Sequence, residues 1–291
     1  MQANELGEVP VLMYHRILVK PISDLDRTPA QLTAELERLA REGYVPVTAA
    51  EYVAGRMDLP AGAHPVVLTF DDGSASQFGY DPHGNVRPDT AVGILLDVAR
   101  RHPGFRPVAT FFVNADPFAL GTRGGDAVRW LVGRGFEIAN HTTHHLDLAG
   151  MSKSRVQREI GTDQRMVLDL GGGEASTFAF PFGALSHLAW ARRGSAGGAT
   201  WNFGGMFLAG WKPADSPFLR GFDPQLIPRI RSDGKTKKYG CNQFCSKAWL
   251  DWLDKNPGKR YTSDGDPRVI SFPVAKAGFL GKNFQAIGRT Y

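Results

Sequence analysis

The chain alternates short apolar runs with helical patterns over its first two thirds. The runs that end at Tyr14, Phe70 and Val113 read as buried strands, and stretches of ten or more residues with helical periodicity separate several of these runs. Strands joined by connections of that length pair in parallel, because an antiparallel pair needs only a tight turn. We therefore predict an α/β fold, specifically a distorted (β/α) barrel with parallel strands.

The pattern also places the individual elements. Strands are expected at residues 9–14, 65–70, 107–113 and 136–140, with a further strand that ends at Pro181; helices are expected at 33–42, 90–101, 125–135, 152–170 and 246–255, and Ser152 is the expected N-cap of the 152–170 helix. After about Gly194 the chain becomes rich in glycine, proline and aromatic residues, which is typical of loops and short strands. We predict one domain over residues 1–291, with a core at about 9–232 and a loop-rich C-terminal extension at 233–291.

Composition limits the classes of function. Hydrophobic residues make up 42% and charged residues 22% of the 291 residues, as in a globular protein in water. The net charge of +5 is too small an excess to indicate a nucleic-acid partner. No apolar run approaches the roughly 18–20 residues of a membrane-spanning helix, so we expect no integral membrane segment.

Two further features leave alternatives open. The first ten residues, "MQANELGEVP", are polar and do not form a signal peptide, so an exported protein would have lost its signal, and a cytoplasmic location is also compatible. Cys241 and Cys245 are the only cysteines, and a short-loop disulfide and two free thiols are equally compatible with their spacing.

Two adjacent carboxylates, Asp71 and Asp72, follow the apolar run "VVLTF". Placing them together is costly unless a cation or hydrogen-bond donors stabilise them. In α/β barrels the carboxyl end of a strand is where ligands bind. A helix cap followed by a turn is the simpler explanation, and the two are equally supported by this segment alone.

A histidine cluster lies about seventy residues later, in "NHTTHH". His141 and His145 are four positions apart, so their imidazoles could converge on one metal ion if the segment forms a helical turn. Imidazole ligands favour Zn, Co, Ni or Fe over Mg or Ca. One aspartate with two histidines leaves a coordination position for water, which is typical of catalytic metal sites.

These motifs resemble a known family. "LTFDDG", "GFEIANHTTHHLDL" and "FAFPFG" are similar, in this order, to the first three motifs of the polysaccharide deacetylases, the NodB-like group or carbohydrate esterase family four. The resemblance covers about residues 9–232. The opening "VPVLMYHRI" resembles the subgroup of poly-N-acetylglucosamine deacetylases.

The resemblance implies a role for each motif residue. Asp72, His141 and His145 would hold a divalent metal, most simply Zn, with Co, Ni or Fe as alternatives, and His144 would lie outside this set. Asp71 would be the general base that takes a proton from the water that the metal activates. The backbone N–H of Phe182 would stabilise the oxyanion, and Thr142 would orient the site by hydrogen bonds.

Two departures from the family pattern affect the catalytic groups. The family's C-terminal motif histidine, its usual general acid, is missing, because the last histidine of the chain is His187. His15, at the end of the first predicted strand, is the expected replacement as acid. The arginine of the third motif is replaced by Ala179, and Arg229 or Arg231 is expected to supply the guanidinium, although a surface position is equally compatible with either.

The resulting hypothesis is a metal-dependent hydrolase that removes N-acetyl groups from a polysaccharide of N-acetylhexosamine, such as poly-N-acetylglucosamine, a chitin-like polymer or peptidoglycan. We expect an extracellular or cell-envelope enzyme that acts as a monomer and has no nucleic-acid partner. One alternative is an O-acetyl esterase on xylan or another glycan. The other is a catalytically degenerate carbohydrate-binding protein, which the missing arginine and histidine favour and the intact acid–histidine set disfavours.

Overall fold

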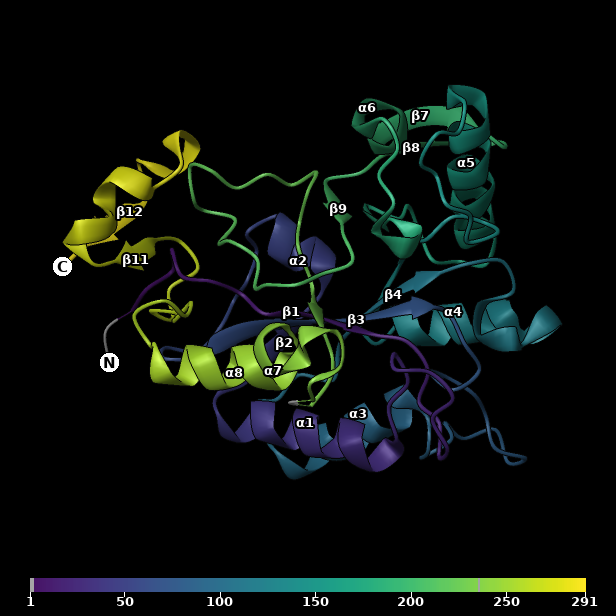
Figure 1. Cartoon of the computed structure of the whole chain (residues 1–291), viewed down its shortest axis with the longest axis horizontal. Coiled ribbons are helices and arrows are strands. Elements are labelled where there is room, and N and C mark those ends of the chain that lie inside the picture. The colour runs from purple at the N-terminus through teal and green to yellow at the C-terminus, as the bar shows by residue number, and fades with distance from the viewer. Residues whose placement is uncertain (1–2, 235) are drawn as a thin grey trace.

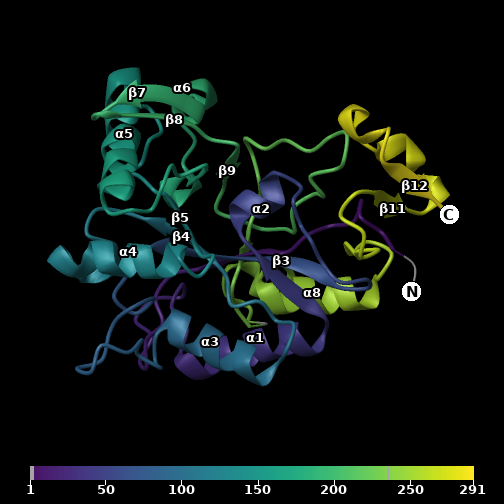
Figure 2. The same cartoon turned by 180° about the vertical axis from the view of Figure 1, so that it is seen from behind.

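The computed structural model describes residues 3–234 and 236–291. Parallel strands form its central sheet in the order β10-β1-β3-β4-β5-β6-β9, and helices pack around the sheet (Figures 1 and 2). The strands are β1 (Val11–Tyr14), β2 (Tyr44–Val47), β3 (His64–Asp72), β4 (Thr110–Val113), β5 (Glu137–Asn140), β6 (Thr177–Ala179), β9 (Gly205–Phe207) and β10 (Ile230–Arg231). Strand β2 pairs in parallel with the first half of β3.

The segment 227–231 brings the two ends of the sheet together. Ile227 bridges in parallel to Phe207 of β9, and its carbonyl accepts a hydrogen bond from the N–H of Leu208 at 2.9 Å. Three residues later, Ile230 pairs with Leu12 of β1. The sheet therefore curves around on itself, and the prediction of a distorted barrel with parallel strands is confirmed.

Helices cover the outside of the sheet, and the longer ones follow the predicted pattern. Their bounds are α1 (Pro29–Arg41), α2 (Ala49–Val53), α3 (Ala91–Arg101), α4 (Gly124–Val132), α5 (Lys153–Asp169), α6 (Leu188–Arg192), α7 (Cys241–Phe244) and α8 (Ser246–Lys255). Helix α1 shows why these segments fold as they do: Thr28 and Gln31 form a capping box, and Leu32, Leu36 and Leu39 point into the core at helical spacing. Helices α1 and α3 lie side by side below the sheet (Figure 1).

The structure differs from the predicted elements at β2 and at the start of β4. Strand β2 was not predicted because Pro46 interrupts its apolar run; the strand lies at an edge, where a missing N–H is tolerated. Strand β4 begins at Thr110 rather than 107, since the N–H of Val108 is used in a turn to Arg106. Ser152 occupies the N-cap position of α5, as predicted, and its hydroxyl lies against that of Ser154 rather than bonding to a backbone N–H of the first turn.

The C-terminal extension packs on the barrel. Tyr261, Ile270 and Leu280 share a buried cluster with Val9 and Val47 from the start of the chain. The extension contains α8 and the pair β11 (Ile270–Phe272) and β12 (Gly288–Thr290), and the hydroxyl of Tyr291 donates to the carbonyl of Ala3 near the start of the described chain. This shared packing supports the interpretation of one domain over residues 1–291, which stays a prediction.

The remaining elements are short. Strands β7 (Arg193–Ala196) and β8 (Ala199–Asn202) form an antiparallel hairpin beside α5. Short 3₁₀ helices span Pro117–Ala119, Gly121–Arg123, Pro181–Gly183, Lys238–Gly240, Val274–Phe279 and Lys282–Phe284. Cys241 and Cys245 are joined by a disulfide bond across α7, which resolves the two alternatives for these residues. Within residues 3–234 and 236–291, no helix has the length and apolar character needed to cross a membrane.

A buried carboxyl group links the N-terminus to this extension and predicts a pH effect on stability. Glu5 accepts hydrogen bonds from the N–H of Ser271 at 2.7 Å and the hydroxyl of Tyr261 at 3.2 Å. Burial raises the pKa of Glu5 from 4.5 to about 7. The folded state therefore binds the proton more tightly than the unfolded state, and stability is lost as the pH rises from about 4.5 through 7.

Replacing Glu5 by glutamine is expected to remove this loss. Relative to the wild type, the free energy of unfolding of Glu5→Gln should increase by up to about 3 kcal/mol between pH 5 and pH 8. Urea unfolding of both proteins at a series of pH values measures the difference. A difference that does not change with pH would mean that Glu5 does not titrate in this range.

Candidate active site

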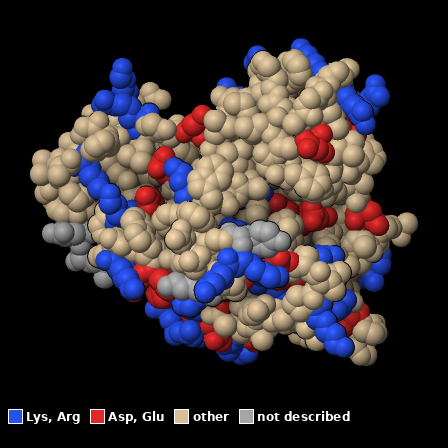
Figure 3. Space-filling view, viewed as in Figure 1, with Lys and Arg blue, Asp and Glu red and all other residues tan. Residues whose placement is uncertain are grey.

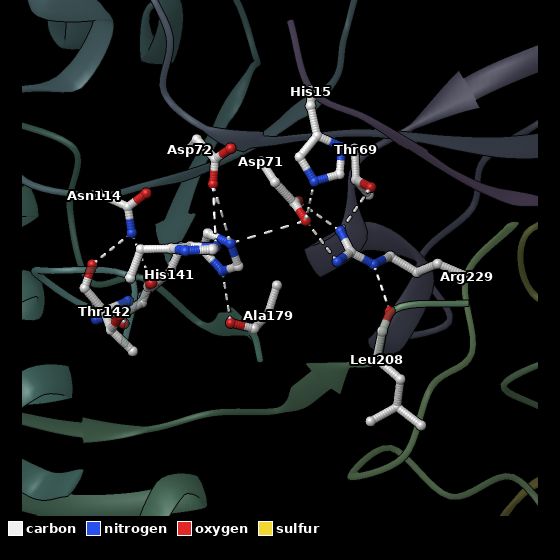
Figure 4. Close-up of polar contacts among 12 residues, drawn as sticks. His15, Thr69, Asp71, Asp72, Asn114, His141, Thr142, Ala179, Leu208 and Arg229 are labelled. Atoms are coloured by element: carbon white, nitrogen blue, oxygen red, sulfur yellow. Dashed lines mark hydrogen bonds and ion pairs between the residues drawn. The ribbon is translucent and has the colours of Figure 1, made fainter. Parts of the chain in front are cut away.

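The candidate site lies at the carboxyl edge of the sheet, where several strands end together (Figure 4). Asp71 and Asp72 are the last two residues of β3, His15 follows β1, and His141 follows β5. Because neighbouring parallel strands end at the same edge, residues more than a hundred positions apart meet there. The sequence-based expectation that these residues lie on one edge agrees with this arrangement.

Asp72, His141 and His145 form a cluster that could hold a metal ion. The Oδ1 atom of Asp72 lies 3.6 Å from Nε2 of His141 and 3.4 Å from Nε2 of His145. One ligand atom from each residue lies within 4.8 Å of the others. Asp72 Oδ1 is buried and has no hydrogen-bond partner among the described residues. A buried carboxylate oxygen is costly to leave unpaired, and a cation bound between the three side chains would pair it.

The hydrogen bonding of His141 leaves its Nε2 atom, which faces Asp72, available to bind a metal ion. Its Nδ1 lies 2.8 Å from the carbonyl oxygen of Ala179, so Nδ1 carries the proton and donates to that oxygen. Nε2, which faces Asp72, is then unprotonated and has a free lone pair. Burial lowers the pKa of His141, although the charges of Asp71 and Asp72 oppose this effect. The donor set of two imidazoles and one carboxylate therefore fits a divalent transition metal.

The two histidines converge without the helical turn expected from their spacing. Thr142 and His145 both have left-handed backbone angles, with φ of 68° and 51°, and no helix forms between residues 141 and 145. The side-chain amide of Asn114 donates to the carbonyls of His141 and Thr142 at 2.8 and 2.7 Å. A tight loop held by these hydrogen bonds, rather than a helix face, brings the imidazoles together.

Helix α5 anchors the same loop from the other side. The carboxylate of Asp163 accepts the N–H of His141 at 3.2 Å, and the carbonyl of Glu159 accepts the N–H of Thr143 at 3.2 Å. His144 points away from the cluster and its Nδ1 lies 3.1 Å from the carboxylate of Glu159. His144 therefore lies outside the metal cluster, as the sequence suggested. Left-handed backbone is strained for residues with a side chain, and these contacts hold it in place.

Asp71 is paired with an arginine from the segment that closes the barrel. Its two carboxylate oxygens accept hydrogen bonds from Nη1 and Nη2 of Arg229 at 2.6 and 2.7 Å (Figure 4). Arg229 is 1% exposed, and its Nε donates to the carbonyl of Leu208 at 2.7 Å. Nη1 also reaches the hydroxyl of Thr69 at 3.1 Å. Of the two candidates, Arg229 and Arg231, it is therefore Arg229 that pairs with Asp71.

This pairing fixes the protonation state of Asp71. Burial alone would raise the pKa of its carboxyl, but the charge of Arg229 and the hydrogen bonds that Arg229 donates lower the pKa well below its ordinary value. Asp71 is therefore ionised at neutral pH. Its Oδ2 atom lies 3.9 Å from Nε2 of His141, next to the candidate metal cluster.

His15 lies on the other side of Asp71. Its Nε2 is 3.9 Å from Oδ2 of Asp71. Burial lowers the pKa of His15, against the opposing charges of Asp71 and Asp72. Nδ1 is buried and has no hydrogen-bond partner within the described chain. An imidazolium would need an acceptor for each N–H, so the resting side chain is the neutral imidazole.

Phe182 lies at the edge of the site in an unusual backbone conformation. It is left-handed, with φ of 59°, within the turn that follows β6. Its ring packs edge-on against His145, with 4.5 Å between ring centroids, and the residue is 68% exposed. The turn thus presents an exposed aromatic ring directly beside a candidate metal ligand.

Sequence reasoning missed the residues that hold the site together. The side-chain amide of Gln77 donates to the backbone carbonyls of both His15 and Asp71, at 3.0 and 2.5 Å. Gln77 lies in the loop 74–89, which follows the Asp71–Asp72 pair, and nothing in the sequence marks it. Asn114 was detectable in principle, as a polar residue directly after a buried strand.

The aromatic stretch from Trp201 to Phe222 contributes less to the surface than its composition suggests. Trp201, Phe203 and Phe207 are buried in the core. Trp211 is the member of this stretch that is half exposed, at 50%. Most of these rings therefore stabilise the barrel rather than form the wall of a sugar-binding cleft.

Comparison with known proteins agrees with this geometry. Residues 58–201 match the family model described as polysaccharide deacetylase. The chitooligosaccharide deacetylase of Rhizobium leguminosarum bv. phaseoli is 32% identical over 133 residues, which are 45% of this chain and 50% of that protein. The one from Bradyrhizobium sp. (strain ANU 289) is 35% identical over 107 residues, 37% of this chain and 40% of that protein. The chain thus spans at most about half the length of these curated relatives.

Solved structures show the same fold over more of the chain. The Streptococcus pyogenes deacetylase PplD, in complex with acetate, superposes with a TM-score of 0.59 at 21% identity and covers 77% of this chain and 92% of its own. IcaB from Ammonifex degensii gives a TM-score of 0.55 at 21% identity, over 78% of this chain and 92% of its own. At such identities the likeness concerns the fold. Motif order, parallel barrel and family match agree, and the chain carries a domain of the polysaccharide deacetylase family at residues 58–201.

Proposed function

We propose that the protein is a metal-dependent hydrolase that removes N-acetyl groups from the N-acetylhexosamine residues of a polysaccharide. One observation carries the proposal: an ionised Asp71, held by Arg229, lies beside the unsatisfied Asp72–His141–His145 cluster. A pure carbohydrate-binding protein has no need for two adjacent carboxylates next to two imidazoles. This arrangement supports a catalytic role over the degenerate-binding alternative.

The chemistry divides between the cation and the side chains. A divalent cation held by Asp72, His141 and His145, with Zn²⁺ as the first choice and Co, Ni or Fe as alternatives, would activate water and polarise the acetamide carbonyl. Asp71 accepts the proton that the attacking water loses, as the new C–O bond forms. The fixed ion pair with Arg229 keeps this carboxylate in one orientation. The backbone N–H of Phe182 is the proposed donor to the developing oxyanion.

The proton then has to reach the leaving nitrogen. Breaking the C–N bond releases an amine, which needs that proton to leave. His15 is neutral at rest and its Nε2 lies 3.9 Å from Asp71, so we assign it the transfer from Asp71 to the amine. Water is thereby added across the amide bond, and acetate and a free amino sugar are the products. Asp71 returns to its ionised form.

The substrate class follows from the family and the curated relatives. Chitooligosaccharide deacetylases are named for an N-acetylglucosamine oligomer, and we propose poly-N-acetylglucosamine, a chitin-like polymer or peptidoglycan as the substrate of this protein. Such glycans lie at or outside the cell envelope, where we propose that the protein acts, as a monomer.

The decisive experiment is acetate release from a panel of substrates. Chitooligosaccharides, β-1,6-linked N-acetylglucosamine, peptidoglycan and acetylxylan are incubated with the protein after metal removal and after addition of Zn²⁺ or Co²⁺. We expect acetate from at least one N-acetylated substrate, and only with added metal. Release from acetylxylan alone would favour the O-acetyl esterase, and activity without any transition metal would contradict the proposed mechanism.

The role of His15 makes a separate prediction. His15→Ala is expected to bind metal with unchanged stoichiometry while turnover falls by about 10²–10⁴-fold, the usual range for loss of a proton-transfer group. Turnover of an O-acetyl substrate should fall less, because an alcohol leaves more easily than an amine. Elemental analysis and acetate release measure the two quantities. Unchanged turnover on the N-acetyl substrate would remove His15 from the reaction.

A further inference from the structure

A second groove lies outside the candidate active site. It has a volume of about 580 Å³, and its lining includes Asn242, Gln243, Phe244, Trp249, Trp252 and Glu8. None of its lining residues belongs to the Asp71–Arg229 pair or the metal cluster. The lining comes chiefly from α7 and α8, in the C-terminal extension. The proposed reaction does not use these residues.

The aromatic rings of the groove are partly exposed. Trp249 and Trp252 lie three positions apart on α8, so they share one face of the helix, whereas Leu250 and Leu253 on the other side are buried. The two indoles meet edge to face, with 5.6 Å between centroids and planes at 82°. Phe244 is 45% exposed at the end of α7. Rigid, partly exposed rings of this kind offer apolar surfaces at little cost in conformational entropy.

Polar groups surround these rings. The exposed amides of Asn242 and Gln243 make no side-chain hydrogen bond among the described residues. The Oε2 atom of Glu8 is buried and also has no partner in the described part of the chain. A buried carboxylate oxygen without a donor is costly, and a ligand hydroxyl or amide N–H would satisfy it. Flat apolar rings beside amides and a carboxylate match the apolar faces and polar edges of an N-acetylated sugar.

Charge disfavours the other classes of polymer. Lys259 is the lysine in the lining, which is too little positive charge to bind a nucleic acid. In the view of Figure 3 the basic side chains are interspersed with acidic ones, and no extended patch of positive charge alone is seen among the described residues on this face. The exposed amides of Asn242 and Gln243 and the carboxylate of Glu8 make the surroundings of the rings polar, which suits a polyhydroxylated sugar better than a hydrophobic protein segment.

The groove is connected to the active site through a short stretch of chain. The indole N–H of Trp249 donates to the carbonyl of Trp211 at 2.8 Å. Three residues before Trp211, the carbonyl of Leu208 accepts the Nε of Arg229, the partner of Asp71. Three extended residues span roughly 10 Å at most. A linear polymer with one unit at the active site is long enough to continue over Trp211 toward α8.

We propose that this groove is a second glycan-binding site, which holds a distant part of an N-acetylhexosamine polymer while another unit is at the active site. The choice of this polymer rests on the proposed function, whereas the existence of a sugar-binding groove does not. Trp252 and Phe244 supply the stacking surfaces, and Glu8 with the amides of Asn242 and Gln243 supplies the polar contacts. The groove favours long substrates over short ones.

The test compares substrate lengths. For a soluble N-acetylglucosamine polymer and for its dimer, kcat/KM is measured in the wild type and in Trp252→Ala. The kcat/KM for the polymer divided by that for the dimer should fall about tenfold in the variant, which is the usual effect of losing one stacked ring from a binding site. Phe244→Ala, on the neighbouring helix, should lower the ratio in the same direction. Phe279→Ala, which removes an exposed ring outside the groove, is the matched control.

Binding without turnover separates the two proposals. Retardation of the protein in a native gel that contains the polymer should be strong for the wild type and lost in Trp252→Ala. If no substrate releases acetate but the wild type is retarded and Trp252→Ala is not, the proposed function is wrong while the proposal of a glycan-binding groove is supported. The proposal of a glycan-binding groove would be overturned if both Trp252→Ala and Phe244→Ala left the polymer-to-dimer ratio of kcat/KM and the retardation in the gel unchanged. Self-association without glycan that Trp252→Ala abolishes, measured by light scattering, would overturn the assignment to a glycan.

Discussion

Replacing Asp71 by asparagine is expected to lower acetate release by about 10²–10⁴-fold while the protein still binds one divalent cation. Asparagine keeps the shape of the side chain but cannot accept the proton that the attacking water loses. The ligand atoms of the metal cluster belong to Asp72, His141 and His145 and are left in place. The loss should therefore appear in kcat rather than in the affinity for metal.

The adjacent carboxylate provides the matched control for this prediction. Asp72→Asn changes the same chemical group one residue away, but it removes a ligand of the cluster instead of the base. We expect Asp72→Asn to bind metal more weakly and to regain part of its activity at high metal concentration, whereas Asp71→Asn does not respond to added metal. Zinc titration and acetate release distinguish the two. Full activity of Asp71→Asn with bound metal would mean that another group is the base.

The sequence predicts the local elements well because their signals are local. Helix α8 was expected at 246–255 and lies at Ser246–Lys255, and α5 differs from its predicted bounds by one residue at each end. Strand β3 was recognisable because a continuous apolar run ends in two carboxylates. A local exception is β2, where Pro46 hides an edge strand from any rule based on apolar runs.

The contacts that complete the site depend on long-range geometry. The pairing of Arg229 with Asp71 joins residues 158 positions apart, and it exists because segment 227–231 closes the barrel. The sequence named Arg229 as a candidate but gave no reason to prefer it over Arg231. The loop from His141 to His145 adopts left-handed angles that its spacing does not signal, and α5 stabilises them through Asp163 and Glu159. Backbone strain of this kind is set by tertiary contacts, which no local pattern records.

Breaking the ion pair between Arg229 and Asp71 is expected to have a large effect on stability. Replacing Arg229 by methionine is expected to lower the free energy of unfolding by about 3–5 kcal/mol, because it leaves the carboxylate of Asp71 buried without its partner. Turnover should fall as well, since the orientation of the base is lost. Arg229→Lys keeps the charge but replaces the two guanidinium nitrogens that bind both oxygens of Asp71 by a single ammonium nitrogen, so its stability should be intermediate and its turnover low. Arg100→Met, which removes an exposed arginine from a surface ion pair, should leave stability unchanged.

A double-mutant cycle separates the ion pair from simple loss of packing. If the loss of stability in Arg229→Met comes from the unpaired carboxylate, then adding Asp71→Asn should recover part of it, and the changes in unfolding free energy of the two single variants should not add.

The pH dependence of the stabilisation by this ion pair has a definite sign. Arg229 lowers the pKa of Asp71, so the stabilisation is present at neutral pH and is lost as the pH falls into the acid range where Asp71 becomes protonated. The gap in unfolding free energy between wild type and Arg229→Met should therefore narrow as the pH falls, starting where the unpaired, buried Asp71 of the variant takes up a proton and continuing toward the lower pH at which the paired Asp71 of the wild type does so. If the difference in unfolding free energy stays constant with pH and the two substitutions have additive effects, Arg229 stabilises the protein through packing alone. Another contact would then have to keep Asp71 ionised and in one orientation.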